Sequence, residues 1–146
     1  MRTLTVVVLG FALGLSASAQ SRKVIQPKEF PTGGPYSPGI LVDGTLYIAG
    51  QIGRDLKTGT IPADFDAEVK QCFANIALVL KEAKDSFDDV VAVQVYLTDM
   101  DLFQRMNTIY TGYFKEPRPA RTTVGVAKLS GGARIEITVT AHRLRR

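Results

Sequence analysis

The chain has almost none of the residues on which metal and redox chemistry depend. Its 146 residues include one cysteine, Cys72, one histidine, His142, and no tryptophan. A lone cysteine cannot form a disulfide within the chain, and a zinc site needs a cluster of Cys, His or carboxylate ligands that is missing here. Cys72 stands among Val69, Phe73 and Ile76 on a helical pattern, which favours a small buried hydrophobic residue over a redox group. We therefore expect neither a metal nor an organic cofactor.

Long apolar runs and clustered charge are also scarce after the first 20 residues. No later run is long enough to suggest a membrane span, and neither a glycine-rich phosphate loop nor a nucleophile elbow is present. The net charge is +4, but the basic residues are spread along the chain apart from those at residues 143–146. Nucleic-acid binding requires a broader basic patch, so the sequence argues against an RNA or DNA partner.

Residues 1–19 have the pattern of a secretory signal peptide. Arg2 gives a positive start, residues 4–15 are mostly apolar, and Ala17-Ser-Ala19 is a small-residue cleavage motif. An uncleaved anchor or a buried first helix is the alternative interpretation. We expect the segment to direct export to the periplasm or the cell exterior. Residues 20–146 then form one domain with no membrane segment after cleavage.

The first part of this domain combines an irregular lead-in with a hairpin. Residues 26–39 are rich in proline and glycine and predict irregular structure. Asp43-Gly44 is a strong hairpin signal between two apolar runs, at residues 40–42 and 45–49. Two antiparallel strands are therefore expected here.

Helical and strand patterns then alternate. Asp64 is a candidate N-cap for a helix with an apolar stripe, and this helix is expected to end near residues 83–84. Residues 90–97 predict a strand, and Asp99 is a candidate cap for a second helix at about residues 100–114. Two last strands are expected, at residues 122–127 and 134–141. The order predicts an α+β domain with a mixed β-sheet and two helices on one face.

The second face of that sheet is not expected to lie free in water. A sheet with one covered face alternates cleanly between apolar and polar residues, but residues 90–97 are apolar on both sides. Tyr47 and Tyr96 also lie on the polar side. We expect this face to pack against another copy of the chain, which predicts a homo-oligomer.

Two charged residues stand out in the last two strands. Val124 and Val126 share one face, so Arg121 and Thr123 share the other, while Glu136 lies opposite the apolar residues of the final strand. A guanidinium can bind a planar carboxylate through two parallel hydrogen bonds. A carboxylate on a neighbouring strand can then handle a proton or a water. A simple Arg–Glu salt bridge is the more common arrangement for such a pair.

Several motifs closely resemble the RidA/YjgF family of reactive-intermediate deaminases, in the family's order and at about its spacings. They cover residues 24–143 and comprise Gly34-Pro-Tyr-Ser-Pro-Gly39, Ile48-Ala-Gly-Gln-Ile52, Asn107-Thr-Ile-Tyr110, Pro119-Ala-Arg-Thr-Thr-Val-Gly-Val-Ala-Lys-Leu129 and Ile135-Glu-Ile137. The resemblance implies that residues 20–146 are a RidA-like domain with a chorismate-mutase-like fold. It also implies a homotrimer with ligand pockets between subunits.

The resemblance further implies roles for individual residues. Arg121 matches the arginine that anchors the carboxylate of a 2-imino acid, and Glu136 the glutamate that positions or activates the attacking water. Tyr36 matches a tyrosine of the same catalytic pocket, and Asn107 and Gly50 match further substrate-binding positions.

Two positions depart from the family pattern. Ala49 stands where many members have a serine, and Thr123, a further substrate-binding candidate, stands where some active members have a cysteine. These changes bear on rate and substrate range more than on reaction type.

The implied activity is that of a 2-iminobutanoate/2-iminopropanoate deaminase, a hydrolase acting on C=N bonds. Its small-molecule partners would be 2-imino and 2-oxo carboxylates. A non-enzymatic trimer that binds small carboxylates, or protects proteins as a holdase, is the main alternative. RNA cleavage has been attached to some relatives, but a single histidine and the lack of a basic and aromatic stripe argue against it.

Overall fold

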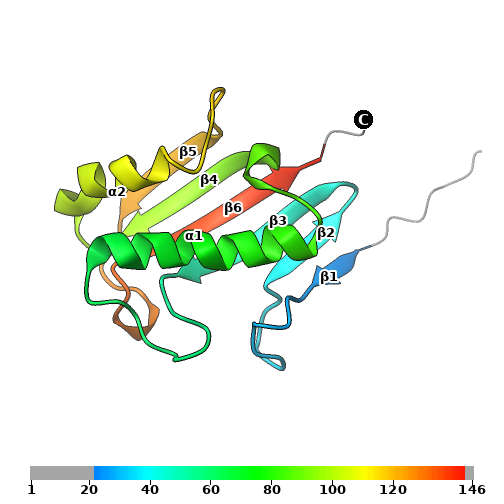
Figure 1. The fold of residues 1–146 in the computed structure, drawn as a ribbon, viewed down its shortest axis with the longest axis horizontal. Helices are drawn as coiled ribbons and strands as arrows, with labels where there is room; N and C mark the ends of the chain where they lie inside the picture. Colours follow the sequence, from blue (N-terminus) through cyan, green and yellow to red (C-terminus); the bar gives the residue numbers. More distant parts are fainter. Residues whose placement is uncertain (1–21, 144–146) are drawn as a thin grey trace, which may run out of the picture.

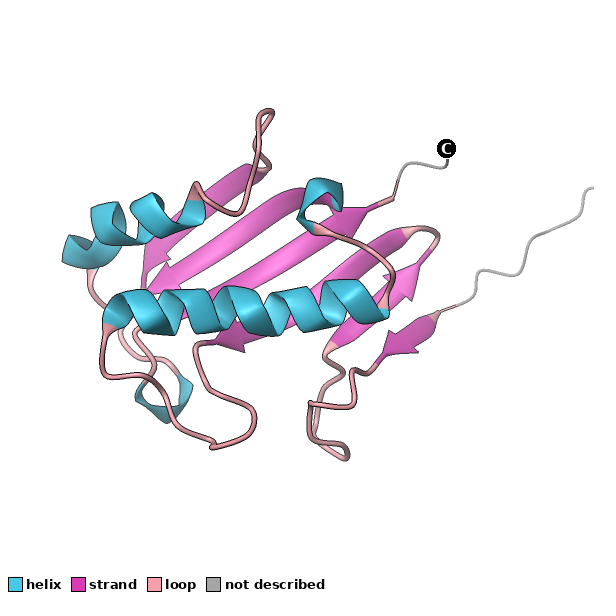
Figure 2. Cartoon of the chain, in the orientation of Figure 1, coloured by secondary structure: helices cyan, strands magenta, loops and turns pink. Residues whose placement is uncertain are grey.

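The computed structural model describes residues 22–143, and the signal peptide expected at residues 1–19 lies outside them. A six-stranded mixed sheet in the order β1-β2-β3-β6-β4-β5 carries two helices on one face (Figures 1 and 2), which confirms the expected α+β class. The strands are β1 Lys23–Ile25, β2 Gly39–Val42, β3 Thr45–Ile52, β4 Val90–Leu97, β5 Ala120–Gly125 and β6 Ile135–His142. The helices are α1 Phe65–Glu82 and α2 Phe103–Tyr110, and short 3-10 turns lie at η1 Phe87–Asp89, η2 Met100–Leu102 and η3 Ser130–Gly132.

Local signals place the hairpin and the first helix as the sequence predicts. Asp43 and Gly44 link β2 to β3 with φ angles of 48° and 79°, the left-handed conformation that a two-residue hairpin turn requires. The Asp64 side chain accepts a hydrogen bond from the backbone N of Ala67 at 2.9 Å and so caps α1. The helix ends at its C-cap, Ala83, also as predicted.

Two elements differ from the prediction. β1 precedes the hairpin and pairs with β2, where no strand was expected; three residues are too few to show a period of two. The second helix is shorter than expected and ends at Tyr110, shortly before Gly112, a residue of low helix propensity. Asp99 caps η2 instead, accepting a hydrogen bond from the backbone N of Asp101.

The core lies between the helices and the sheet. The alternation predicted for β6 is confirmed, because Ile135, Ile137, Val139 and Ala141 are all buried on the helix side. Cys72 is buried in the same core, and burial raises the pKa of its thiol well above the ordinary value. The cysteine is therefore a packed core residue, as its helical pattern indicated.

The strand order separates Arg121 from Glu136. β4 lies between β5 and β6, so the two residues are not on neighbouring strands, which corrects the expectation from sequence. The register pairs Arg121 with Val93 of β4, whose side chain is buried on the helix side. Glu136 pairs with Tyr96, three residues further along β4 and therefore on the other side. Arg121 lies on the helix-covered face of the sheet, and Glu136 lies on the opposite face.

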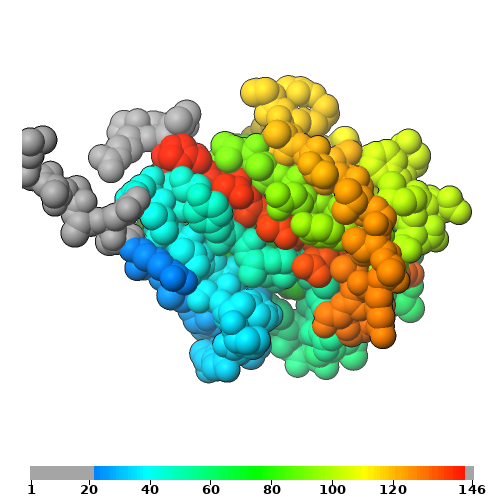
Figure 3. Space-filling view, turned by 180° about the vertical axis from the view of Figure 1, so that it is seen from behind, coloured from blue at the N-terminus to red at the C-terminus, as the bar shows by residue number. Residues whose placement is uncertain are grey.

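No helix of residues 22–143 covers that opposite face, which we call the open face (Figure 3). A row of register-paired residues crosses all six strands without a charge: Val24, Ile40, Tyr47, Thr140, Ala92 and Ala120. Val24 is 51% exposed, Tyr47 55% and Val124 41%. Exposed apolar patches, when they are large and contiguous, are typical of surfaces that bind another protein.

Candidate active site

Arg121 is held by aromatic rings rather than by a carboxylate. Its guanidinium carbon lies 4.4 Å from the ring centroid of Tyr110 and 5.7 Å from that of Phe103, both on α2. Within residues 22–143, Arg121 takes part in no ion pair or side-chain hydrogen bond. Other arginines do pair with carboxylates of the same chain: Arg105, Arg118, Arg134 and Arg143. The simple Arg121–Glu136 salt bridge is thus absent from the described chain, and the N–H donors of Arg121 remain available.

A surface hollow of about 440 Å³ opens beside this guanidinium. It is lined by Asn107, Tyr110, Thr111, Arg118, Pro119 and Arg121, and we call it the Arg121 hollow. The fold thereby brings together two of the residues singled out in the sequence, Asn107 from α2 and Arg121 from β5. A hollow of this size accommodates a small organic acid.

Arg118 is a second cation in the Arg121 hollow that the sequence reasoning missed. Its guanidinium pairs with the Glu116 side chain, and its backbone N donates to Glu116 Oε2 at 3.3 Å. Prolines flank Arg118 on both sides, and the sequence analysis assigned it no role in a site. Two arginines separated by Pro119 and Ala120 were the signal that could have identified it.

Tyr110 forms the floor under the guanidinium and is itself buried. Burial raises the pKa of Tyr110, while the positive charges of Arg121 and Arg118 oppose that rise. Its hydroxyl therefore stays neutral around pH 7. Within the described chain that hydroxyl has no hydrogen-bond partner.

Glu136 and Gly50 form a second cluster, on the open face. The β3–β6 register shifts between Ile48 and Gln51, and this irregularity places Gly50 against the Glu136 side chain. A Cβ built at residue 50 would lie 1.9 Å from Glu136 Oε1. Glycine at this position therefore gives the carboxylate its space.

Tyr36 belongs to the loop that runs beside this second cluster. Pro38 O accepts a hydrogen bond from the backbone N of Ala49, next to Gly50, so the loop follows β3 at that point. The Tyr36 side chain is 64% exposed. It is not among the residues that line the Arg121 hollow.

Thr123 lies on the helix side of β5, two residues beyond Arg121, in register with Val95. Its Oγ1 is buried and has no hydrogen-bond partner in the part of the chain that the structure describes. Thr123 is not among the residues that line the Arg121 hollow. A single chain thus presents Arg121 and Asn107 on one side of the sheet, and Glu136 and Gly50 on the other.

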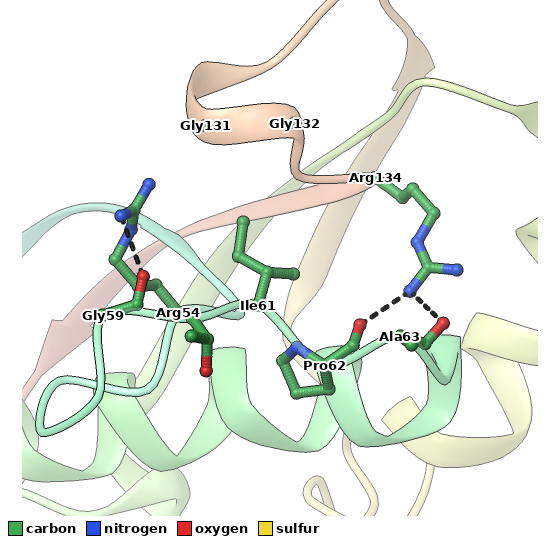
Figure 4. Close-up of a pocket in the computed structure, with 9 residues that line it drawn as sticks. Arg54, Gly59, Ile61, Pro62, Ala63, Gly131, Gly132 and Arg134 are labelled. Atoms are coloured by element: carbon green, nitrogen blue, oxygen red, sulfur yellow. Dashed lines mark hydrogen bonds between the residues drawn. The ribbon is translucent and has the colours of Figure 1, made fainter.

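A different hollow, of about 460 Å³, also contains two arginines but does not form an anion clamp (Figure 4). Arg134 donates to Glu68 Oε2 at 2.7 Å and to the carbonyl oxygens of Pro62 and Ala63. Arg54 lies at the other end, beyond Ile61, and donates to the Gly59 carbonyl. The two guanidiniums brace the loop before α1 instead of converging on a ligand.

Residues 22–143 offer neither a metal-binding cluster nor a membrane-spanning helix. This stretch contains no group of three or more His, Cys, Asp or Glu side chains that could hold a metal ion. None of its helices has the length and apolar character needed to cross a bilayer.

Known proteins resemble the chain over most of its length. The family model described as Endoribonuclease L-PSP matches residues 27–143. A RutC family protein of Aquifex aeolicus is 40% identical over 122 residues, which is 82% of this chain and 98% of the relative. The 2-iminobutanoate/2-iminopropanoate deaminase of Homo sapiens is 43% identical over 126 residues, or 85% and 92% of the two chains.

A solved structure agrees with the sequence comparison. RidA from the Antarctic bacterium Psychrobacter sp. PAMC 21119 superposes with a TM-score of 0.79 at 36% identity, and the match covers 83% of this chain and 99% of that one. Fold, motifs and sequence identity thus point to the same group of proteins. The chain belongs to the Endoribonuclease L-PSP family, the RidA/YjgF family that its motifs resemble.

Proposed function

We propose that the protein hydrolyses reactive 2-imino acids and their enamine tautomers to 2-oxo acids and ammonia. The observation that carries the proposal is the environment of Arg121. Its guanidinium lies over the Tyr110 ring beside an open hollow and pairs with no carboxylate of residues 22–143. Relatives about 40% identical to the chain carry the name 2-iminobutanoate/2-iminopropanoate deaminase, which supports the same reaction.

Binding begins at the substrate carboxylate. The planar guanidinium of Arg121 can donate two parallel hydrogen bonds to it. The aromatic faces of Tyr110 and Phe103 hold the guanidinium without using its N–H groups. Asn107 lines the same hollow and offers an amide that can donate or accept a hydrogen bond.

Hydrolysis then requires one water. Glu136 orients that water and accepts a proton as the oxygen attacks the imine carbon. Glu136 returns this proton to the nitrogen of the resulting carbinolamine. The hydroxyl group then loses its own proton as the C–N bond breaks, which forms the C=O bond of the 2-oxo acid and releases ammonia, so one water is consumed for each ammonia. Imines already hydrolyse in water, so positioning and electrostatic stabilisation suffice for catalysis.

A complete site then needs two copies of the chain. Arg121 and Glu136 lie on opposite faces of one sheet with β4 between their strands, so we place Glu136 of a second copy against the Arg121 hollow. The uncharged row across the open face fits an interface with such a copy. The homotrimer implied by the family resemblance is the assembly we propose.

A test of the role of Glu136 distinguishes an enzyme from a non-enzymatic carboxylate-binding module. Imine hydrolysis and 2-oxobutanoate affinity should be measured for the wild type and for Glu136→Gln. A general base is worth about 10²–10⁴-fold in rate, so the variant should keep its affinity and lose most hydrolysis. Equal hydrolysis by both proteins would refute the role of Glu136. Binding without hydrolysis by either protein would favour the non-enzymatic module.

RNA cleavage finds less support, although the family description names an endoribonuclease. The single histidine is His142, at the end of β6. Its Nδ1 lies 2.9 Å from Oγ1 of Thr45 in β3, and the two atoms share a hydrogen bond. Several arginines of the described chain are paired with its own carboxylates, which leaves fewer cations for phosphates.

A further inference from the structure

The Arg121 hollow contains two guanidiniums, and the proposed reaction uses only one of them. Arg118 and Arg121 both line it, separated along the chain by Pro119 and Ala120. A guanidinium group offers several N–H donors in a rigid planar fork that matches a carboxylate. The hollow therefore combines a fixed positive charge for the 2-imino carboxylate with a second fixed positive charge.

Arg118 can exchange its present partner for a ligand. Glu116 is its ion-pair partner, and the two side chains are 45% and 69% exposed. Exposed ion pairs of this kind contribute little to stability, because water competes for both charges. A carboxylate that is already held nearby by Arg121 can replace Glu116 at small cost.

We infer that the site prefers 2-imino acids with a second acidic group, such as four- or five-carbon 2-imino dicarboxylates, and that Arg118 binds this group. The inference rests on the proposed function and names its substrate class. The chemistry is unchanged: water adds to the C=N carbon and ammonia leaves, while the distal carboxylate keeps its charge. A hollow of about 440 Å³ has room for such a molecule.

The test compares two substrates across matched variants. Values of kcat/KM are measured for freshly generated 2-iminoglutarate and 2-iminobutanoate, with the wild type, Arg118→Gln and Arg54→Gln. The Arg54 variant also removes one positive charge, but from the hollow of Figure 4. Losing a charged hydrogen-bond partner should lower the ratio of dicarboxylate to monocarboxylate activity about tenfold in Arg118→Gln relative to Arg54→Gln. An equal ratio in all three proteins would overturn the inference.

Glu116→Gln gives a change in the opposite direction. Without its competing carboxylate, Arg118 should bind a dicarboxylate more tightly, so the ratio should rise. A fall in the ratio would contradict the role of Arg118.

Binding separates this inference from the proposed function. If the wild type hydrolyses neither imine, the proposed function fails, and calorimetry with 2-oxoglutarate and 2-oxobutanoate still tests the preference. Tighter binding of 2-oxoglutarate by the wild type, lost in Arg118→Gln, supports the inference. Equal affinities for the two acids would reject it.

Discussion

Gly50 and Glu136 fit together so closely that any side chain at residue 50 would occupy the place of the carboxylate. A Cβ there would lie 1.9 Å from Glu136 Oε1, the free end of a side chain. Gly53 provides a contrast, because its Cβ would lie 2.3 Å from the backbone carbonyl oxygen of Glu68 in α1. The first contact can be relieved by rotating a side chain, whereas the second requires a helix to move.

Gly50→Ala should therefore remove activity with little loss of stability. The methyl group turns the Glu136 carboxylate away from its position, and imine hydrolysis should fall at least tenfold, as expected when a catalytic group is misplaced. Gly53→Ala should instead lower the thermal unfolding temperature, because backbone must shift. Hydrolysis rates and thermal melts of both variants check this. Wild-type turnover by Gly50→Ala would exclude the present position of Glu136 as the working one.

Tyr110 should matter through its ring and not through its hydroxyl. Tyr110→Leu removes the aromatic face under Arg121, a contact worth about 0.5–2 kcal/mol, and should weaken 2-oxobutanoate binding by a corresponding factor. Tyr110→Phe keeps the face and loses only a hydroxyl that is buried without a partner in the described chain. Calorimetric affinities of the two variants provide the measurement. Equal losses in both would assign the effect to the hydroxyl.

Mixing two inactive variants should restore activity if the site is shared between copies. Arg121→Ala and Glu136→Gln should each abolish or strongly reduce hydrolysis when present alone. Randomly mixed oligomers contain some sites with both residues intact, about a quarter of the total at equal amounts. Co-refolded variants are assayed against the same proteins mixed without refolding. Activity that never recovers would place both groups in one chain's site.

The free energy of unfolding should decrease at alkaline pH because of the buried Cys72 thiol. Burial holds the pKa of the folded thiol above that of the unfolded thiol, so above about pH 9 the folded state binds more protons. The free energy of unfolding therefore falls as pH rises, by at most about 1.4 kcal/mol per pH unit for this group. The stability advantage of the wild type over Cys72→Ala should shrink above about pH 9 in denaturant titrations. A constant difference would show that the thiol ionises equally in both states.

Export remains a prediction from the sequence. We expect the full chain, expressed in a secreting bacterium, to be cleaved after Ala19 and recovered outside the cytoplasm with Gln20 at its start. Fractionation and intact mass measure this directly, with a chain that lacks residues 2–19 as the retained control. An intact chain found only in the cytoplasm would contradict the signal peptide.

Local features of the fold could be predicted because a few neighbouring residues determine them. The turn at Asp43-Gly44 and the cap at Asp64 depend on backbone and side-chain preferences within about four residues. The alternation of β6 likewise identifies its buried side chains and leaves Glu136 on the other face.

The order of the strands could not be read in this way. Nothing within β5 or β6 records that β4 lies between them, so the expected adjacency of Arg121 and Glu136 was wrong. The place of Arg118 beside Arg121 could not be predicted from the sequence, because the two residues share a hollow only in the folded chain. Motif resemblance proposed Asn107 and Gly50 as site residues, and the structure adds what each lies beside: Arg121 for Asn107 and the Glu136 side chain for Gly50.

The separation of Arg121 and Glu136 by the sheet has a genetic consequence. In the proposed homotrimer, every chain contributes Arg121 to one active site and Glu136 to another. A chain that lacks both residues but still assembles would silence two of the three centres in a trimer that it enters. A defective allele of this kind should act dominantly over an intact one, and its effect should exceed its share of the protein produced.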